Sequence, residues 1–322
     1  MTVSVLPDAP AITGAAGPEP SIDVAICTRN RQPLLAQTLD AVRRAAEGRP
    51  AVRILVVDNG STDGTAAYLA EQAAADPRIV HRSEPQAGIY HARATAVRTS
   101  TADWLVFIDD DVIPRPDFLA RFADLFADPT VGAVGASISG LFHGPLPDWF
   151  PRRFLSSIPL LPVSLPIEEC AFPNYPPGAC LAVRRVPCLD YYLVPQRREA
   201  ELGYGGGAIS GQPMTGGEDT DLCEIYVRAG FRVIRSSGVC VQHRVEVHRL
   251  TEAWIIGKFA IDGRTRIRVA RLFGRPLFAR YTLAMLAALP VLALLAPVAP
   301  LAGRHTGLLV RAYHVKSLAA WR

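Results

Sequence analysis

Apolar runs alternate with helical stretches along the first 130 residues. The segments "IDVAICT" (22–28), "VRILVVD" (52–58) and "DWLVFID" (103–109) are short and apolar, as buried strands are. Residues 34–46, the stretch after Asp63, residues 88–100 and residues 117–127 have the apolar spacing of helices. This alternation predicts an α/β fold with a parallel, doubly wound, Rossmann-like sheet.

The following region is expected to contain two long loops and one more helix. Residues 141–178 are rich in proline and show no lasting period, which indicates ordered loops that cross the sheet. The Gly-rich stretch 203–217 has the length of either a functional lid or a disordered segment. A helix is expected from about Asp219 to Gly230, which would stop it.

Polar residues follow the predicted strands. Thr28, Asp58 and the run "DDD" at 109–111 come where strands end, which is the edge at which doubly wound sheets bind ligands. Three adjacent carboxylates repel one another unless a cation or a hydrogen-bond donor compensates. Mg²⁺ or Mn²⁺ would do so with two carboxylates two residues apart. A solvated acidic turn is the alternative interpretation.

Three other polar positions allow both a structural and a functional interpretation. In "VVDNGSTDGT" (56–65), an Asx turn and a helix cap account for most residues, although Asp58 could also read a base or a ribose hydroxyl. The acids of "GGEDTD" (216–221) suit a helix start, but a closing glycine loop could also place one of them over a pocket. His243, among basic neighbours, is either structural or a ligand.

The charge of the chain is unevenly distributed. Residues 240–322 hold thirteen Lys or Arg and three Asp or Glu, about +10, whereas the remainder, with 21 basic and 27 acidic residues, is about −6. A basic tail suits phosphates or anionic lipid. It lacks interleaved aromatic residues and adjoins an apolar stretch, which argues against a nucleic-acid partner.

An uncharged stretch of 23 residues, 281–303, is long enough to span a bilayer. Pro290, Pro297 and Pro300 argue against a straight span, and basic residues on both sides conflict with a single crossing. We therefore expect a proline-broken hairpin or an in-plane helix pair on the membrane surface. A buried helical core segment is the alternative.

The cysteines and the first residues indicate in which compartment of the cell the protein lies. The six cysteines show no C-x-x-C pairing and mostly lie in apolar runs, which indicates reduced core residues and a cytosolic body. Residues 1–21 have no basic n-region and no apolar h-region, so a disordered leader is expected rather than a signal peptide.

The ordered set of motifs resembles a family of known enzymes. The motifs "ICTRNR", "VVDNGSTDGT", "AGIYHARATAV", "FIDDDVIPRPDF", "PPGACLAVRR", "GGEDTDLCEIYVRAGFRV" and "VQHRV" together resemble a family 2 glycosyltransferase of the GT-A fold, over residues 22–245. The resemblance implies a GT-A domain at 22–250, after the leader (1–21) and before a basic, apolar, membrane-associating helical tail (251–322).

The resemblance also implies roles for site residues. Thr28, Asp58, Arg93, Asp109 and Asp110 would bind a nucleotide-sugar donor. Asp109, Asp111 and His243 would hold Mg²⁺ or Mn²⁺ against its diphosphate, and Asp219 would be the general base. A single displacement of this kind inverts the anomeric centre. The acceptor would be a saccharide, expected to be lipid-linked, at the cytoplasmic face of the inner membrane.

The sequence departs from the family pattern at several points. Asn59 stands where a second acid is frequent, which leaves the choice of base open, and Cys180 stands where a polar residue is frequent. No Q-x-x-R-W motif and no multiple membrane spans are present, which favours a single-addition enzyme over a polymerase. The alternatives are a sugar nucleotidyltransferase and a non-catalytic membrane scaffold that retains the fold.

Overall fold

The computed structural model describes most of the chain. The described residues are 20–144, 146–150, 154–155, 158–172, 174–192, 217–274 and 277–321. The Gly-rich loop expected at 203–217 lies outside the described residues apart from Gly217, and so does the expected leader apart from residues 20 and 21.

A parallel half-sheet forms where the apolar runs predict it. The strands β1 (Ile22–Thr28), β2 (Val52–Asp58), β3 (Ile79–Ser83) and β4 (Trp104–Asp109) lie side by side in the order β3-β2-β1-β4, all parallel. The bounds of β1 and β2 are those predicted from the sequence. The carboxyl ends of these strands therefore meet at one edge.

The other half of the sheet combines parallel and antiparallel pairs, so the sheet is mixed and not the parallel sheet that the sequence predicted. Beyond β4 the order continues β8-β6-β9-β5, with β7 (Glu168–Glu169) beside β9. The strand β8 (Cys180–Arg184) is antiparallel to both β4 and β6 (Val131–Phe142), and β9 (Arg232–Val245) is parallel to β6. The short strand β5 (Val112–Pro114) is antiparallel to β9.

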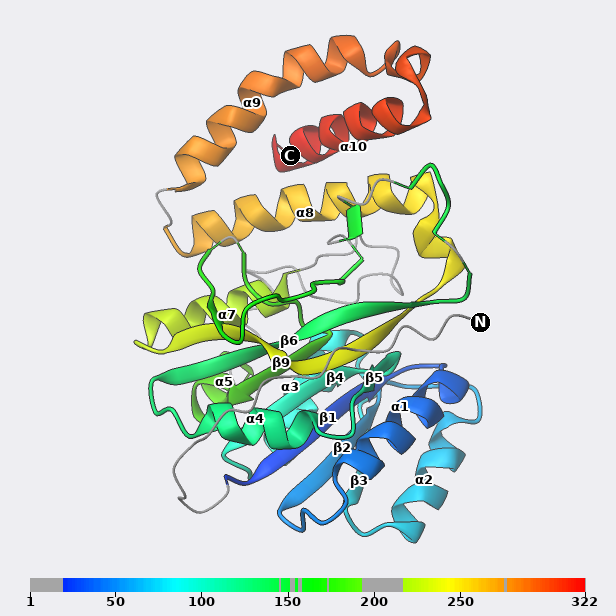
Figure 1. The fold of residues 1–322 in the computed structure, drawn as a ribbon, viewed down its shortest axis with the longest axis vertical. Coiled ribbons are helices and arrows are strands. Elements are labelled where there is room, and N and C mark those ends of the chain that lie inside the picture. Colours follow the sequence, from blue (N-terminus) through cyan, green and yellow to red (C-terminus); the bar gives the residue numbers. More distant parts are fainter. Residues whose placement is uncertain are drawn as a thin grey trace.

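In the part of the chain that the structure describes, helices cover both faces of the sheet (Figure 1). Alternate residues of β1 divide between the faces: Ile22, Val24 and Ile26 belong to one core cluster, and Ala25 belongs to the other. The first face is covered by α1 (Gln32–Ala45), α2 (Thr65–Ala75) and α4 (Phe118–Phe126). The second is covered by α3 (Ile89–Thr99), α5 (Arg185–Tyr192) and α7 (Glu218–Arg228).

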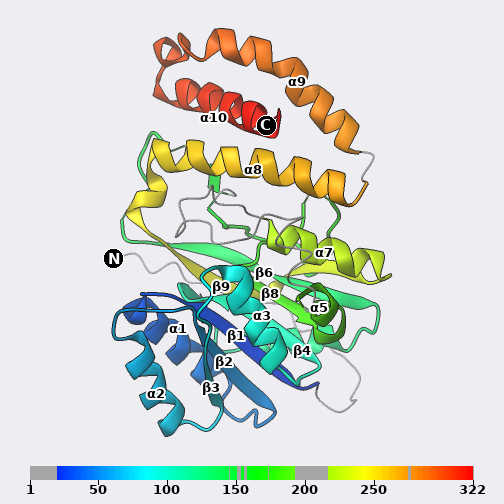
Figure 2. The same cartoon turned by 180° about the vertical axis from the view of Figure 1, so that it is seen from behind.

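The chain ends in a helical layer stacked on the sheet domain. It contains η3 (Val247–Leu250), α8 (Glu252–Leu272), α9 (Leu277–Leu295), η4 (Ala299–Ala302) and α10 (Arg304–Trp321). In Figures 1 and 2, α8 lies between the sheet domain and α10, and α9 is outermost. A Cβ on Gly263 of α8 would lie 2.3 Å from the carbonyl oxygen of Lys316, so glycine permits this close packing of α8 and α10.

This layer shares the core of the sheet domain. Ile255 and Phe259 of α8, and Leu308 and Ala312 of α10, are buried in the same apolar cluster as the first face of the sheet. The segment expected to be a proline-broken hairpin, 281–303, forms all of α9 after its first four residues, with Pro290 inside the helix, and continues through η4. No helix among the described residues combines the length and the apolar character that crossing a membrane requires.

Candidate active site

The register of the parallel strands brings three predicted site residues to one rim. Thr28 pairs with Asp58 across β1 and β2, and Cys27 pairs with Asp109 across β1 and β4. Asp58 and Thr28 are buried, whereas the Asp109 side chain is 36% exposed. The rim therefore presents Asp109 to solvent between buried polar neighbours.

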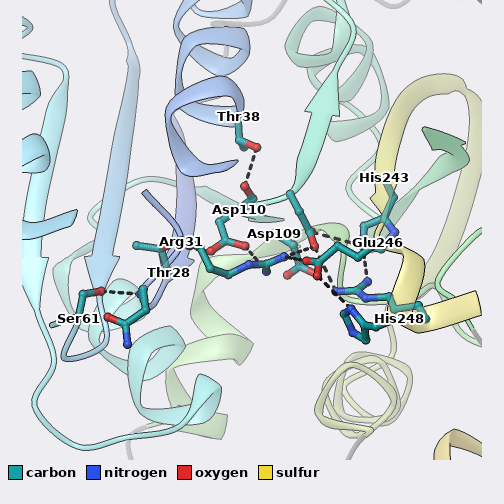
Figure 3. Close-up of polar contacts among 12 residues, drawn as sticks. Thr28, Arg31, Thr38, Ser61, Asp109, Asp110, His243, Glu246 and His248 are labelled. Atoms are coloured by element: carbon teal, nitrogen blue, oxygen red, sulfur yellow. Dashed lines mark hydrogen bonds and ion pairs between the residues drawn. The ribbon is translucent and has the colours of Figure 1, made fainter. Parts of the chain in front are cut away.

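Asp110 is tied to the loop that follows β1. Its carboxylate accepts a hydrogen bond from the Thr28 hydroxyl at 2.7 Å and pairs with Arg31 at 2.6 Å (Figure 3). Its backbone carbonyl accepts a hydrogen bond from the Thr38 hydroxyl of α1 at 2.9 Å. Burial raises the pKa of Asp110 to about 7, although Arg31 and Thr28 oppose the rise. Asp110 therefore fixes the aspartate turn to β1 and α1.

The pairing of β5 with β9 brings His243 to the aspartate turn. Val112 lies opposite His243, and His243 Nε2 is 3.3 Å from an oxygen of Asp111. Three possible ligand atoms lie within 4.8 Å of one another, one from each of Asp109, Asp111 and His243. The sequence motifs "DDD" and "VQHRV", about 130 residues apart, thus form one group, here called the metal-type cluster: Asp109, Asp111 and His243.

Two arginines lie against Asp111. Arg31 approaches one of its oxygens at 2.8 Å and Arg249 approaches the same oxygen at 3.2 Å. Burial opposes ionisation, but His243 and the two arginines hold the pKa of Asp111 well below its usual range. Asp111 is thus held in its ionised form, as a metal ligand would need to be.

The donor set fits a divalent cation. Carboxylate oxygens suit Mg²⁺ and Mn²⁺, and imidazole suits transition metals, so this set accommodates Mn²⁺ in particular. Asp111 and His243 are buried, and Asp109 is open enough for water or a substrate phosphate to complete the shell. Asp109, Asp111 and His243 are the residues that would hold the ion.

Arg93 of α3 connects the cluster to the start of α7. Its guanidinium is 3.5 Å from Asp109 and 3.6 Å from Glu218, and it donates to the carbonyl of Gly178 at 3.2 Å. Glu218 also accepts a hydrogen bond from the Tyr192 hydroxyl. Burial opposes the charge on Arg93, but Glu218 and Asp109 keep its pKa above its usual value.

Asp219 differs from the two other acids in the first turn of its helix in its exposure. Glu218 and Asp221 are buried, and Asp221 pairs with Arg268 of α8 at 3.3 Å. Asp219 is half-buried, and its carboxylate accepts hydrogen bonds from the backbone N–H groups of Gly178 at 2.9 Å and Thr220 at 2.8 Å. Of these three acids it is the one that can reach a substrate hydroxyl.

The loop after β2 shows why asparagine occupies position 59. The buried Asn59 side chain donates to the carbonyls of Glu84 and Gln86 and accepts from the N–H of Gly88. An ionised acid at position 59 could not donate the two hydrogen bonds to these carbonyls, so Asn59 has a structural role: it holds the loop after β2 against residues 84–88. Asp58 beside it accepts from the N–H of Ser61 at 2.9 Å, as expected for an Asx turn.

Sequence reasoning missed several members of the site. Arg31 and Gly178 stand inside motifs that were noticed, but nothing local shows that Arg31 binds two aspartates or that Gly178 lies between Arg93 and Asp219. Glu246 pairs with Arg31 at 2.7 Å and with His248 at 3.1 Å (Figure 3). Only the packing of β9 against β5 brings it there.

The fold is that of a GT-A glycosyltransferase domain. A mannosyltransferase of Pyrobaculum calidifontis, solved with GDP-Man and Mn²⁺, has this fold with a TM-score of 0.57 and 23% identity, covering 93% of this chain and 86% of that one. GalNAc-T7, solved with UDP, GalNAc and Mn²⁺, has a TM-score of 0.52 and 13% identity, covering 79% and 54%.

The family follows from the sequence. Residues 23–184 match the sequence profile of glycosyl transferase family 2, and the chain belongs to this family. It is 29% identical over 192 residues to the pre-mycofactocin glycosyltransferase of Mycobacterium tuberculosis, covering 60% of this chain and 37% of the relative. It is 27% identical over 271 residues to the succinoglycan biosynthesis protein ExoM of Rhizobium meliloti, covering 83% and 81%.

The relatives differ in length. The chain spans only 37% of the length of the mycobacterial relative. It is also 28% identical over 221 residues to an N-acetylglucosaminyltransferase of Mesorhizobium japonicum, which covers 67% of this chain and 49% of that relative. Residues 23–184, which match the family profile, include Asp109 and Asp111.

Proposed function

We propose that this protein transfers one sugar from a nucleotide-sugar donor to a saccharide acceptor, with Mg²⁺ or Mn²⁺ and with inversion at the anomeric carbon. One observation carries the proposal. The half-buried carboxylate of Asp219 is linked through Gly178 and Arg93 to Asp109 of the metal-type cluster. An acceptor base and a diphosphate site thus lie in one connected network.

In this proposal each part of the site has one task. Thr28 and Asp58, at the ends of β1 and β2, bind the nucleoside, and Arg93 offers positive charge to the diphosphate. A divalent ion, when bound, neutralises the charge that develops on the leaving diphosphate. Asp219 takes the proton of the acceptor hydroxyl as its oxygen attacks the anomeric carbon. Attack from the side opposite the leaving group inverts that centre.

The relatives support a saccharide acceptor. One relative is named for succinoglycan biosynthesis, and others are named N-acetylglucosaminyltransferases. Structural neighbours were solved with GDP-Man or with UDP, which supports a nucleotide-linked donor. We propose an acceptor that belongs to a surface or secreted polysaccharide and is carried on a lipid.

An exposed apolar surface supports work at a membrane, at its cytoplasmic face. This α9–η4 surface comprises Val291, Leu294, Leu295, Val298 and Leu301. Leu294 is 78% and Leu301 88% exposed, far more than the core side chains of α8 and α10. Such a surface in a strongly basic C-terminal region suits the interface of an anionic bilayer.

The test of the proposed reaction is a donor panel. Thermal unfolding of the full chain is followed with Mn²⁺ and each of several nucleotide sugars, since a true donor stabilises the fold by mass action. The stabilising donor is then incubated with lipid-linked saccharides and the product is analysed for the anomeric configuration. Stabilisation by no nucleotide sugar, or retention of configuration in the product, would contradict the proposal.

A further inference from the structure

Arg249 contacts two of the three members of the metal-type cluster. One of its guanidinium nitrogens lies 3.1 Å from His243 Nε2, and the other lies 3.2 Å from the carboxylate of Asp111. These are two of the three groups whose ligand atoms converge. The positive charge of Arg249 thus lies where two ligands of a divalent ion would need it.

His243 Nε2 has two neighbours with opposite requirements. The guanidinium of Arg249 can only donate a hydrogen bond, whereas the oxygen of Asp111 at 3.3 Å can only accept one. A metal ion at Nε2 requires this nitrogen to be unprotonated, and in that form Nε2 accepts from Arg249.

The arginine and a metal ion compete for the same two groups. The guanidinium of Arg249 lies against both His243 Nε2 and the carboxylate of Asp111, so an ion that binds these two groups must displace the arginine. We propose that Arg249 is a placeholder cation: it stabilises Asp111 and His243 before the metal arrives and leaves when the metal binds. The inference rests on the metal dependence in the proposed function.

The local structure suits such an exchange. Arg249 lies in η3, a single turn with no buried residue, and its side chain is 18% exposed. Arg31, the other cation on Asp111, is bound more firmly, because it also pairs with Asp110 and Glu246. Arg31 thus remains as the permanent partner, and Arg249 is the one that moves.

The exchange has a thermodynamic consequence. An ion arriving alone must break the contacts of Arg249, which weakens its binding. A diphosphate offers the released guanidinium a new anionic partner, so the ion and the nucleotide bind better together than separately. Arg249 would make the loading of metal and donor mutually dependent.

The experiment measures the binding of Mn²⁺ in the absence of nucleotide. The EPR signal of free Mn²⁺ is followed as the full-length protein is added, because bound Mn²⁺ no longer contributes to it. We expect Arg249→Met to bind Mn²⁺ at least about tenfold more tightly than wild type, because a nearby positive charge is removed. Arg249→Lys keeps the positive charge but lacks the planar fork that places one nitrogen on each group, so its Mn²⁺ affinity should fall between those of wild type and Arg249→Met. Added nucleoside diphosphate should tighten Mn²⁺ binding less in Arg249→Met than in wild type.

The matched control is Arg244→Met. Arg244 follows His243 in the sequence, but its side chain hydrogen-bonds Gln37. An equal gain in this control would show a net-charge effect and overturn the inference. Unchanged or weaker Mn²⁺ binding by Arg249→Met and Arg249→Lys would overturn it as well, while the metal site would stand. Absence of Mn²⁺ binding in every protein would remove both the inference and the metal dependence of the proposed function.

Discussion

The backbone N–H of Gly178 donates a hydrogen bond to the carboxylate of Asp219 at 2.9 Å. The carbonyl of the same glycine accepts from Arg93 at 3.2 Å. Gly178, two residues before β8, therefore orients both the proposed base, Asp219, and the cation that faces Asp109, Arg93. The geometry of the proposed reaction depends on this loop as much as on the carboxylates.

Replacing the proposed base should separate binding from chemistry. We expect Asp219→Asn to bind donor like wild type and to lose about 10²–10⁴-fold in turnover, because the acceptor proton has no base. Transfer rates and donor affinity are measured on the same preparation.

The control is Asp221→Asn in the same helix. Asp221 is fully buried against Arg268, so its replacement should lower the unfolding temperature and leave turnover of the folded protein nearly unchanged. Turnover within twofold of wild type for Asp219→Asn would move the base to another acid.

A methyl group at Gly178 should disturb the site without unfolding the protein. A Cβ there would lie 3.1 Å and 3.2 Å from the two terminal guanidinium nitrogens of Arg93, so the Arg93 side chain must shift by a few tenths of an ångström, whereas its distance of 3.4 Å from Cβ of Asp219 is an ordinary contact. We expect Gly178→Ala to lower turnover several-fold to about 10²-fold. Gly144→Ala, where a Cβ meets nothing within 4 Å, is the control. Equal turnover in the two variants would refute the positioning role.

The parallel half of the fold could be read from the sequence because its strands are continuous apolar runs. The strand β6 could not, since Gly132, Gly135 and Gly140 interrupt its pattern. These glycines are dictated by neighbours distant in sequence: a Cβ on Gly135 would lie 2.2 Å from Pro176. The antiparallel direction of β8 likewise depends on long-range pairing, which no local pattern records.

The carboxylates of the site could be predicted because they stand at strand ends. Their partners could not, because the side chains of Arg31 and Arg249 meet Asp111 only through the pairing of β5 with β9 and the packing of α1. Local sequence identifies groups that need compensation, whereas tertiary structure identifies the groups that supply it.

The docking of α10 on α8 should depend on pH. Glu252 accepts hydrogen bonds from Arg304 and Arg311, each at 2.6 Å, and these hold its pKa below the usual value. A lowered carboxyl pKa adds stability above the ordinary value, and this stability disappears as the pH falls through the folded value. Glu252→Gln should therefore cost about 1 kcal/mol or less near pH 7, since the arginines are exposed.

The measurement is unfolding by urea at about pH 7 and about pH 3. The difference between wild type and Glu252→Gln should shrink at the lower pH, where Glu252 itself becomes protonated. A difference that grows on acidification would show that other groups hold α10.

Membrane association should depend on the α9–η4 surface. We expect Leu294→Gln combined with Leu301→Gln to reduce sedimentation with anionic vesicles at least about tenfold, because two leucines lose their favourable burial. Both side chains are exposed, so the unfolding temperature should stay the same. Leu165→Gln, at an exposed leucine of the sheet domain, is the control. Undiminished vesicle binding by the double variant would exclude this surface.

The most direct test of the account is whether Asp111 makes donor binding metal-dependent. Binding of the donor found in the panel is measured by calorimetry with and without Mn²⁺, for wild type and Asp111→Asn. Circular dichroism confirms that both proteins are folded, and Asp117→Asn, outside the cluster, controls for lost charge. We predict that Mn²⁺ strengthens donor binding in wild type and in Asp117→Asn but leaves it unchanged in Asp111→Asn. An equal response to Mn²⁺ in all three proteins would contradict the assignment of the metal-type cluster as the site of the divalent ion.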